Sequence, residues 1–153
     1  ATKLPFKNNF FDTVFCTQVL EHIADHQGVF SEAHRVLKQG GVFIASLPMY
    51  WPHHEDPYDF FRFTKYGIKY LLDKYNFEVL LIKQNGGKWT LVGQAFLLAM
   101  QNSKNKTIYS SIKKIIYHLF FIKLIVNILF SFLNKISKDE SDTLNFVFVG
   151  KKL

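Results

Sequence analysis

The chain has 153 residues, of which 48% are hydrophobic and 17% aromatic, so it can bury a core and extensive disorder is not expected. Its single cysteine, Cys16, excludes an internal disulfide and favours a reduced, cytoplasmic setting. All of the net charge of +7 lies in residues 104–138, where lysines alternate with aliphatic residues rather than with stacking aromatics, which argues against a nucleic-acid partner.

The first third of the chain predicts a strand–helix–strand unit. Residues 11–17 are a short apolar, β-branched run, which is typical of a buried strand. Residues 25–37 carry apolar side chains at helical spacing, with Asp25 as the N-cap and Gly40-Gly41 ending the helix. Residues 42–48 form a second buried run. This order implies a parallel pair of strands joined by a right-handed crossover.

The pattern of alternating elements continues after an irregular segment, 49–63, that is rich in proline, histidine and aromatic residues. Thr64 is expected to cap a helix that Asn76 closes. Residues 77–83 and 145–149 predict two further strands. Strands that alternate with helices indicate an α/β fold.

Several stretches resemble a known family. They are LPFKNNFFDTVFCTQVLEHI and HRVLKQGGVFIASLP near the start, then PHHEDPYDFFRFT and FEVLLIKQNGG, and finally NFVFVGKKL. Together they resemble the second half of the class I S-adenosylmethionine-dependent methyltransferases that act on small molecules. Such enzymes have a seven-stranded, doubly wound, Rossmann-like sheet. The resemblance implies that this chain supplies the C-terminal part of it, strands four to seven, with a final antiparallel strand.

The resemblance also implies a domain organisation. The chain as a whole, 1–153, is expected to be a partial methyltransferase domain that begins after the glycine-rich cofactor loop. Residues 1–90 would form the sheet, its helices and an active-site loop. Residues 91–140 would form a basic, hydrophobic helical insert, and residues 141–153 the closing strand.

The cofactor implied by the resemblance is S-adenosylmethionine. Ligands in open α/β sheets bind outside the carboxyl ends of the strands, so the residues that follow 11–17 should rim the crevice. By resemblance, Ala1 and Leu4 lie in the loop beside the adenine, and Thr17 and Gln18 meet the methionine part. Leu4 has an alternative role in filling the core.

His22 is the catalytic candidate, because the resemblance places it near the reacting sulfonium. A neutral imidazole suits proton removal near pH 7, and His53 or His54 is the second choice for such a base. A dedicated base is not required where alignment of the reacting atoms suffices. The alternative is that Glu21 and His22 only begin the next helix or form a hydrogen-bonded hinge.

The irregular segment is expected to act as a lid or substrate pocket. Its candidate substrate-binding residues are His53, His54, Tyr58 and Arg62. The alternative for Arg62 is an ion pair with Asp59, three residues before it.

The same segment also contains residues that could bind a metal. His53, His54, Glu55 and Asp56 have suitable ligand types, with His22 and His26 as further partners. Adjacent histidines on a loop rarely both reach one ion, and no second cluster has the usual spacing. The sequence therefore predicts no metal.

The basic hydrophobic segment predicts helices over 91–100 and 107–138. A membrane-spanning helix is disfavoured, because a central Lys123 costs roughly 2.5–3.5 kcal/mol and the last strand must return to the sheet. We therefore expect peripheral contact with a membrane surface, on its inner face, through 107–138, or alternatively packing within the chain.

The expected function of the intact protein is transfer of a methyl group from S-adenosylmethionine to a small-molecule or lipid-linked acceptor, with the fragment itself inactive. The alternative is a non-catalytic, membrane-associated α/β module that keeps the methyltransferase fold. Loss of cofactor binding would favour the alternative.

Overall fold

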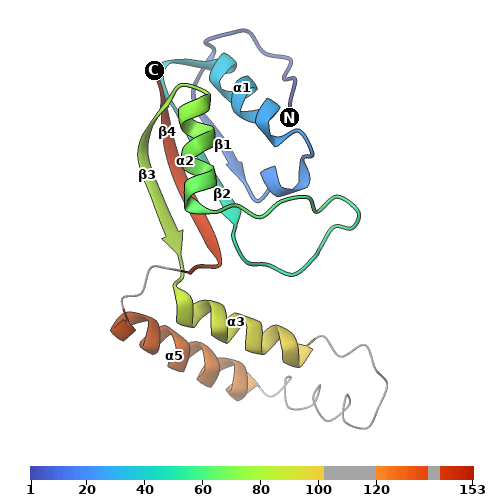
Figure 1. Cartoon of the computed structure of the whole chain (residues 1–153), viewed down its shortest axis with the longest axis vertical. Coiled ribbons are helices and arrows are strands. Elements are labelled where there is room, and N and C mark those ends of the chain that lie inside the picture. The colour runs from blue at the N-terminus through green and yellow to red at the C-terminus, as the bar shows by residue number, and fades with distance from the viewer. Residues whose placement is uncertain (102–119, 138–141) are drawn as a thin grey trace. The chain divides into compact units, whose positions relative to one another are not determined.

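The computed structural model describes residues 1–101, 120–137 and 142–153. The chain divides into two compact units, one made of 1–85 with 145–153 and the other of 86–144 (Figure 1). The first unit contains the sheet and the second contains a pair of helices.

The first unit is built on a four-stranded mixed sheet with strand order β1-β2-β4-β3. The strands are β1 (Phe11–Thr17), β2 (Leu37–Pro48), β3 (Phe77–Asn85) and β4 (Asn145–Lys152). β1 and β2 are parallel, whereas β4 lies between β2 and β3 and runs antiparallel to both. The predicted α/β fold and its closing antiparallel strand are confirmed.

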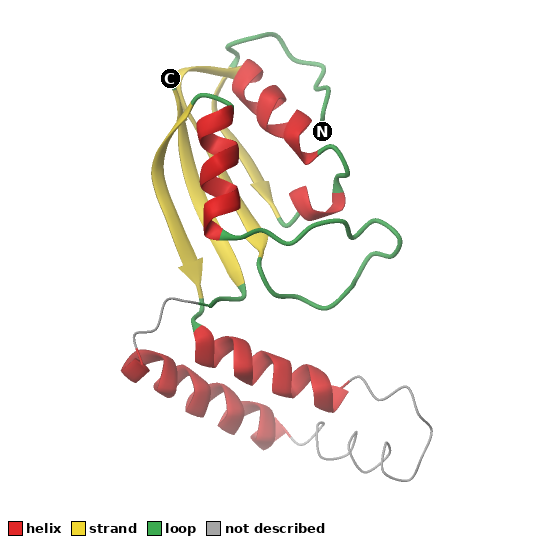
Figure 2. Ribbon diagram, viewed as in Figure 1, coloured by secondary structure: helices red, strands yellow, loops and turns green. Residues whose placement is uncertain are grey.

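Helices α1 (His26–Val36) and α2 (Lys65–Lys74) cover one face of this sheet (Figure 2). Strand side chains alternate between the two faces, so Phe43 of β2 and Phe148 of β4 point to the helices and are fully buried. Their rings pack edge to face at 5.1 Å between centroids, and Phe30 of α1 stacks on Phe148 at 5.8 Å. These aromatic contacts join the two layers into one core.

Both helices begin where the sequence predicted. The side chain of Asp25 accepts a hydrogen bond from the Gly28 amide at 3.0 Å, and the hydroxyl of Thr64 accepts one from the Gly67 amide at 3.1 Å. Asn76, with φ of 56°, follows the end of α2 in the left-handed conformation.

The prediction that Gly40-Gly41 end α1 is wrong. The helix ends at Val36, and Leu37 is already extended and begins β2. Gly40 has a φ of 77° and lies inside β2, where the pairing with β1 shifts register. The glycine therefore serves a bulge, where a positive φ costs a residue without Cβ little.

The expectation that β1 is buried is also wrong. β1 pairs with β2, and its other edge has no partner strand among the described residues. Phe15 is 70% exposed as a result.

The second unit pairs α3 (Lys88–Gln101) with α5 (Phe120–Ser137). Gly93 allows the close approach, because a Cβ at that position would lie 2.8 Å from the Phe130 ring. The predicted helices are thus confirmed for 88–101 and 120–137, while residues 107–119 and Lys138 lie outside the described residues. Within the described parts, neither helix is long and apolar enough to cross a bilayer.

Candidate functional site

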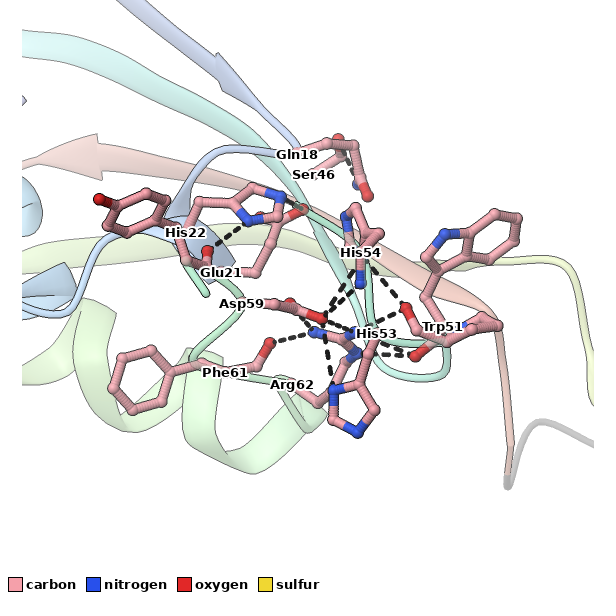
Figure 3. Close-up of polar contacts among 12 residues, drawn as sticks. Gln18, Glu21, His22, Ser46, Trp51, His53, His54, Asp59, Phe61 and Arg62 are labelled. Atoms are coloured by element: carbon pink, nitrogen blue, oxygen red, sulfur yellow. Dashed lines mark hydrogen bonds and ion pairs between the residues drawn. The ribbon is translucent and has the colours of Figure 1, made fainter. Parts of the chain in front are cut away.

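The carboxyl ends of β1 and β2 face the loop 49–63, and polar side chains gather there (Figure 3). Gln18 follows β1 with a φ of 51°, which turns the chain out of the sheet. Its side-chain amide donates to the Ser46 hydroxyl at 3.0 Å, and its backbone amide donates to the Ser46 carbonyl. Thr17 and Gln18 are both exposed, so they form an open rim at the edge of the sheet.

A hollow of about 350 Å³ lies beside this rim. It is lined by Gln18, Ser46, Trp51, His54, Asn85 and Asn145. Gln18 and His54 were candidates from the sequence, whereas Ser46, Asn85 and Asn145 were not. In the sequence, each of these three is a polar residue at or near one end of an apolar strand. Only the strand order shows that these ends meet.

The short 3₁₀ helix η1 (Leu20–His22) holds the histidine that the sequence selected. Nδ1 of His22 lies 2.7 Å from the carbonyl oxygen of Tyr58, so Nδ1 donates and Nε2 of the neutral ring keeps its lone pair. The His22 ring meets the His54 ring edge to face at 4.7 Å between centroids. The turn thus brings a histidine of η1 against a histidine of the loop.

Glu21 is a residue of this turn that the sequence considered only, together with His22, as the start of the next helix or a hydrogen-bonded hinge. It is fully buried, and neither carboxylate oxygen accepts a hydrogen bond from any residue that the structure describes. Burial raises the pKa of its carboxyl group, and that shift is opposed first by the backbone amide of Glu21 itself and then by the nearby His22, His54 and Arg62. Its carboxylate oxygen lies 3.9 Å from Nε2 of His22. The feature of the sequence that could have pointed to Glu21 is that its carboxylate is next to His22, the candidate base.

Asp59 and Arg62 pair with each other, as the sequence alternative proposed. Two guanidinium nitrogens of Arg62 donate to the two carboxylate oxygens of Asp59 at 2.6 and 2.8 Å. The guanidinium also donates to the carbonyl oxygens of Trp51 and Pro52. Hydrogen bonds from Arg62 hold the pKa of Asp59 well below its usual range. Arg62 is therefore engaged in holding the shape of the loop.

The other loop candidates are open to solvent. The side chain of His53 is 90% exposed and its Nδ1 lies 3.7 Å from Asp59. The side chain of Tyr58 is exposed, and only its backbone carbonyl contacts His22. The structure thus brings His54, and not His53, to His22.

The two N-terminal candidates lie apart from this hollow. Ala1 is exposed. The Leu4 amide donates to Glu32 at 2.6 Å, its carbonyl accepts from Arg35, and it lines a separate hollow beside α1. Hydrogen bonds from Arg35 lower the pKa of Glu32 to about 2. Leu4 is half-buried, so it neither fills the core nor shares the hollow of Gln18 and His54.

Comparisons with known proteins find methyltransferases. A methyltransferase-domain family model matches residues 1–45. The chain is 46% identical over 41 residues to a sterol 24-C-methyltransferase of Gibberella zeae, which is 27% of this chain and 11% of that protein. It is 32% identical over 80 residues to the ubiquinone/menaquinone biosynthesis C-methyltransferase of Coxiella burnetii, which is 52% of this chain and 27% of that protein. Residues 1–45 thus resemble a methyltransferase domain, and the longer match extends this resemblance to S-adenosylmethionine-dependent methyltransferases over 52% of the chain.

Solved methyltransferase structures share the fold of this chain. The structure of an S-adenosylmethionine-dependent methyltransferase from Archaeoglobus fulgidus matches with a TM-score of 0.54 at 12% identity, over 96% of this chain and 62% of that one. At that identity the likeness establishes the fold alone. The matches to the two curated relatives span 11% and 27% of their length.

The cofactor of this family is S-adenosylmethionine. The residues at the carboxyl ends of β1 and β2 offer polar groups to one side of the cofactor. Gln18 and Ser46 present amide and hydroxyl groups, and Thr17 is exposed beside them. These polar groups lie at strand ends, where open α/β sheets bind their ligands. The cofactor, when bound, supplies an electrophilic methyl group.

Proposed function

We propose that the protein to which this chain belongs transfers a methyl group from S-adenosylmethionine to a small-molecule acceptor. The observation that supports this most directly is the hollow at the carboxyl edge, which Gln18, Ser46 and His54 line next to His22. Gln18 and Ser46 would hold the methionine part of the cofactor, and the loop 49–63 would hold the acceptor.

His22 is the proposed base. Its Nδ1 proton is donated to the carbonyl of Tyr58, which fixes the tautomer and leaves Nε2 to accept a proton from the acceptor. Asp59 and Arg62 would act indirectly, because their ion pair shapes the loop that carries His54.

The acceptor is proposed to be lipid-linked, presented at a membrane surface. The supporting feature is a set of exposed apolar side chains on α5: Leu124, Ile125, Ile128, Leu129, Phe132 and Ile136. Lysines of the same segment would add about 1 kcal/mol each on an anionic surface. Flotation with anionic vesicles should therefore recover the protein, less so in high salt or with Phe132→Ser. Tyr66→Ser, which changes an exposed aromatic of the first unit, is the matched control. Equal recovery of both variants would contradict contact through α5.

Methyl transfer is tested on the longest natural reading frame that contains this chain. Labelled S-adenosylmethionine is incubated with the protein and a lipid extract, and binding of S-adenosylhomocysteine is titrated separately. Gln18→Ala should weaken that binding by about tenfold, the equivalent of one lost hydrogen bond. Gln27→Ala on α1 is the control of the same residue type. Absence of cofactor binding in the wild type would instead favour the non-catalytic, membrane-associated module.

The 153-residue chain by itself is proposed to bind the cofactor weakly and to be inactive. Thr17 and Gln18 form an exposed rim, whereas small ligands with useful affinity have roughly 70–90% of their surface buried. Calorimetric titration of the chain with S-adenosylhomocysteine tests this, and low-micromolar affinity would contradict it.

A further inference from the structure

We infer that Glu21, His22 and His54 form a binding site for a divalent transition metal such as zinc. One ligand atom from each residue lies within 4.8 Å of the others. The first two residues come from η1 and the third from the loop after β2, so the cluster exists only because the loop folds back on the turn (Figure 3). The backbone amides of Phe60 and Phe61 donate to the Glu21 carbonyl and hold the loop there.

Glu21 provides a second, independent observation. Its side chain is 0% exposed, its two oxygens accept no hydrogen bond within the described residues, and Figure 3 shows the carboxylate beside the two rings. A buried carboxylate without hydrogen-bond partners is unfavourable, and buried charges in proteins are normally paired or coordinate a metal. A cation between Glu21 and the histidines would satisfy these oxygens.

The two imidazoles are already oriented as metal ligands are. Nδ1 of His22 donates to the Tyr58 carbonyl at 2.7 Å, and Nδ1 of His54 lies 3.1 Å from the Pro52 carbonyl. Histidine ligands usually donate their second ring proton to a carbonyl or carboxylate, which fixes the tautomer and the ring orientation. Nε2 of each ring is then the nitrogen available to bind.

The ligand set indicates the type of metal. Two imidazoles and one carboxylate suit zinc and ferrous iron, whereas magnesium and calcium prefer oxygen ligands. Ligand atoms in a tetrahedral zinc site lie about 3.3 Å apart for bond lengths near 2.0–2.1 Å, so ligand atoms that are up to 4.8 Å apart need to close by as much as about 1.5 Å. Three protein ligands leave one coordination position open, which is the pattern of catalytic rather than structural sites.

This site differs from the metal arrangement that the sequence disfavoured. His53 does not contribute to the cluster, because its side chain is exposed to solvent, so the two adjacent histidines do not both bind. The third ligand is Glu21, which the sequence did not include among the candidate ligands. The inference does not rest on the proposed methyl transfer. His22 can act as the proposed base only while no metal is bound, since Nε2 cannot accept a proton while it binds a metal.

The test is a titration of the metal-free 153-residue chain with Zn²⁺ by calorimetry and with Co²⁺ by visible absorption. The wild type should bind one equivalent of either ion, and Mg²⁺ should not compete. Glu21→Gln keeps the size of the buried side chain, and His54→Ala changes a half-exposed one. Each should weaken Zn²⁺ binding by at least the roughly 10- to 100-fold that loss of an outer-shell partner causes. His53→Ala is the matched control, because it removes the neighbouring histidine from outside the cluster.

Folding of each variant is checked by circular dichroism and by its melting temperature in chelator. Equal Zn²⁺ affinity in the wild type, Glu21→Gln and His54→Ala would overturn the inference. A loss of binding in His53→Ala as large as in His54→Ala would also overturn it, since it would point to an exposed histidine pair. We expect Zn²⁺ binding to weaken in Glu21→Gln and His54→Ala alone, and the Co²⁺ absorption bands to disappear in the same two variants.

Discussion

Replacement of Glu21 by glutamine should stabilise the metal-free protein. The substitution removes a buried charge and keeps the shape of a side chain that is 0% exposed. A buried charged group without partners costs about 1–3 kcal/mol or more, and the glutamine amide retains part of that cost. We therefore expect the free energy of unfolding to rise by about 1 kcal/mol at pH 7, which is a melting temperature about 2–4 °C higher for a chain of this length.

The effect should depend on pH in a defined direction. Burial raises the pKa of Glu21 above its ordinary value of 4.5, so the folded protein binds the proton more tightly than the unfolded chain does. Well below pH 4.5 the carboxyl is protonated in both states, and the difference in stability between wild type and variant should be smallest. As the pH rises through the folded-state pKa, the wild type loses stability relative to Glu21→Gln.

Thermal unfolding in chelator between pH 4 and pH 8, followed by circular dichroism, measures this difference. Glu55→Gln is the control, because it makes the same substitution at an exposed carboxylate of the loop. A Glu21→Gln variant that is less stable at pH 7, or whose difference does not change with pH, would refute the reasoning. It would mean that the Glu21 carboxylate is compensated in the folded protein.

Three further predictions concern stability. Lys152→Met should lower the free energy of unfolding by about 1–3 kcal/mol, because the Lys152 amine donates to three acceptors at 2.7–2.8 Å that would lose their partner. Lys151→Met, which removes only an exposed ion pair, should change it by less than about 1 kcal/mol, and equal melting temperatures for the two variants would contradict this. Asp59→Asn should destabilise the protein near neutral pH and not in acid. Arg62 lowers the pKa of Asp59 below its ordinary 3.8, so the stabilisation by the ion pair exists above pH 3.8 and is lost as the pH falls below it. A pH-independent difference in melting temperature between wild type and variant would contradict the assignment. Gly40→Ala should cost about 1–2 kcal/mol through its φ of 77° alone, since the added Cβ has open space, and Gly40→Asn should cost less; urea unfolding curves that rank the two variants in the opposite order would contradict this.

Much of the local structure follows from the sequence, because caps and side-chain periodicity act over a few residues. Asp25 and Thr64 cap the helices as predicted, and Asn76 ends α2. Gly40-Gly41 show where this reasoning fails. A glycine pair after a helix favours a C-cap, but pairing between β1 and β2 requires a positive φ inside the strand instead, and that pairing is not visible in a local pattern.

In the candidate site too, one part follows from the local sequence and another part depends on the tertiary structure. The sequence by itself determined that Gln18 and His22 follow the carboxyl end of the first strand, because position along one strand is a local property. The tertiary structure decided which distant residues join them. Insertion of β4 between β2 and β3 brings Asn145 to the hollow. Folding of the loop onto η1 brings His54 to Glu21 and His22, since contacts between distant segments depend on how the whole chain packs.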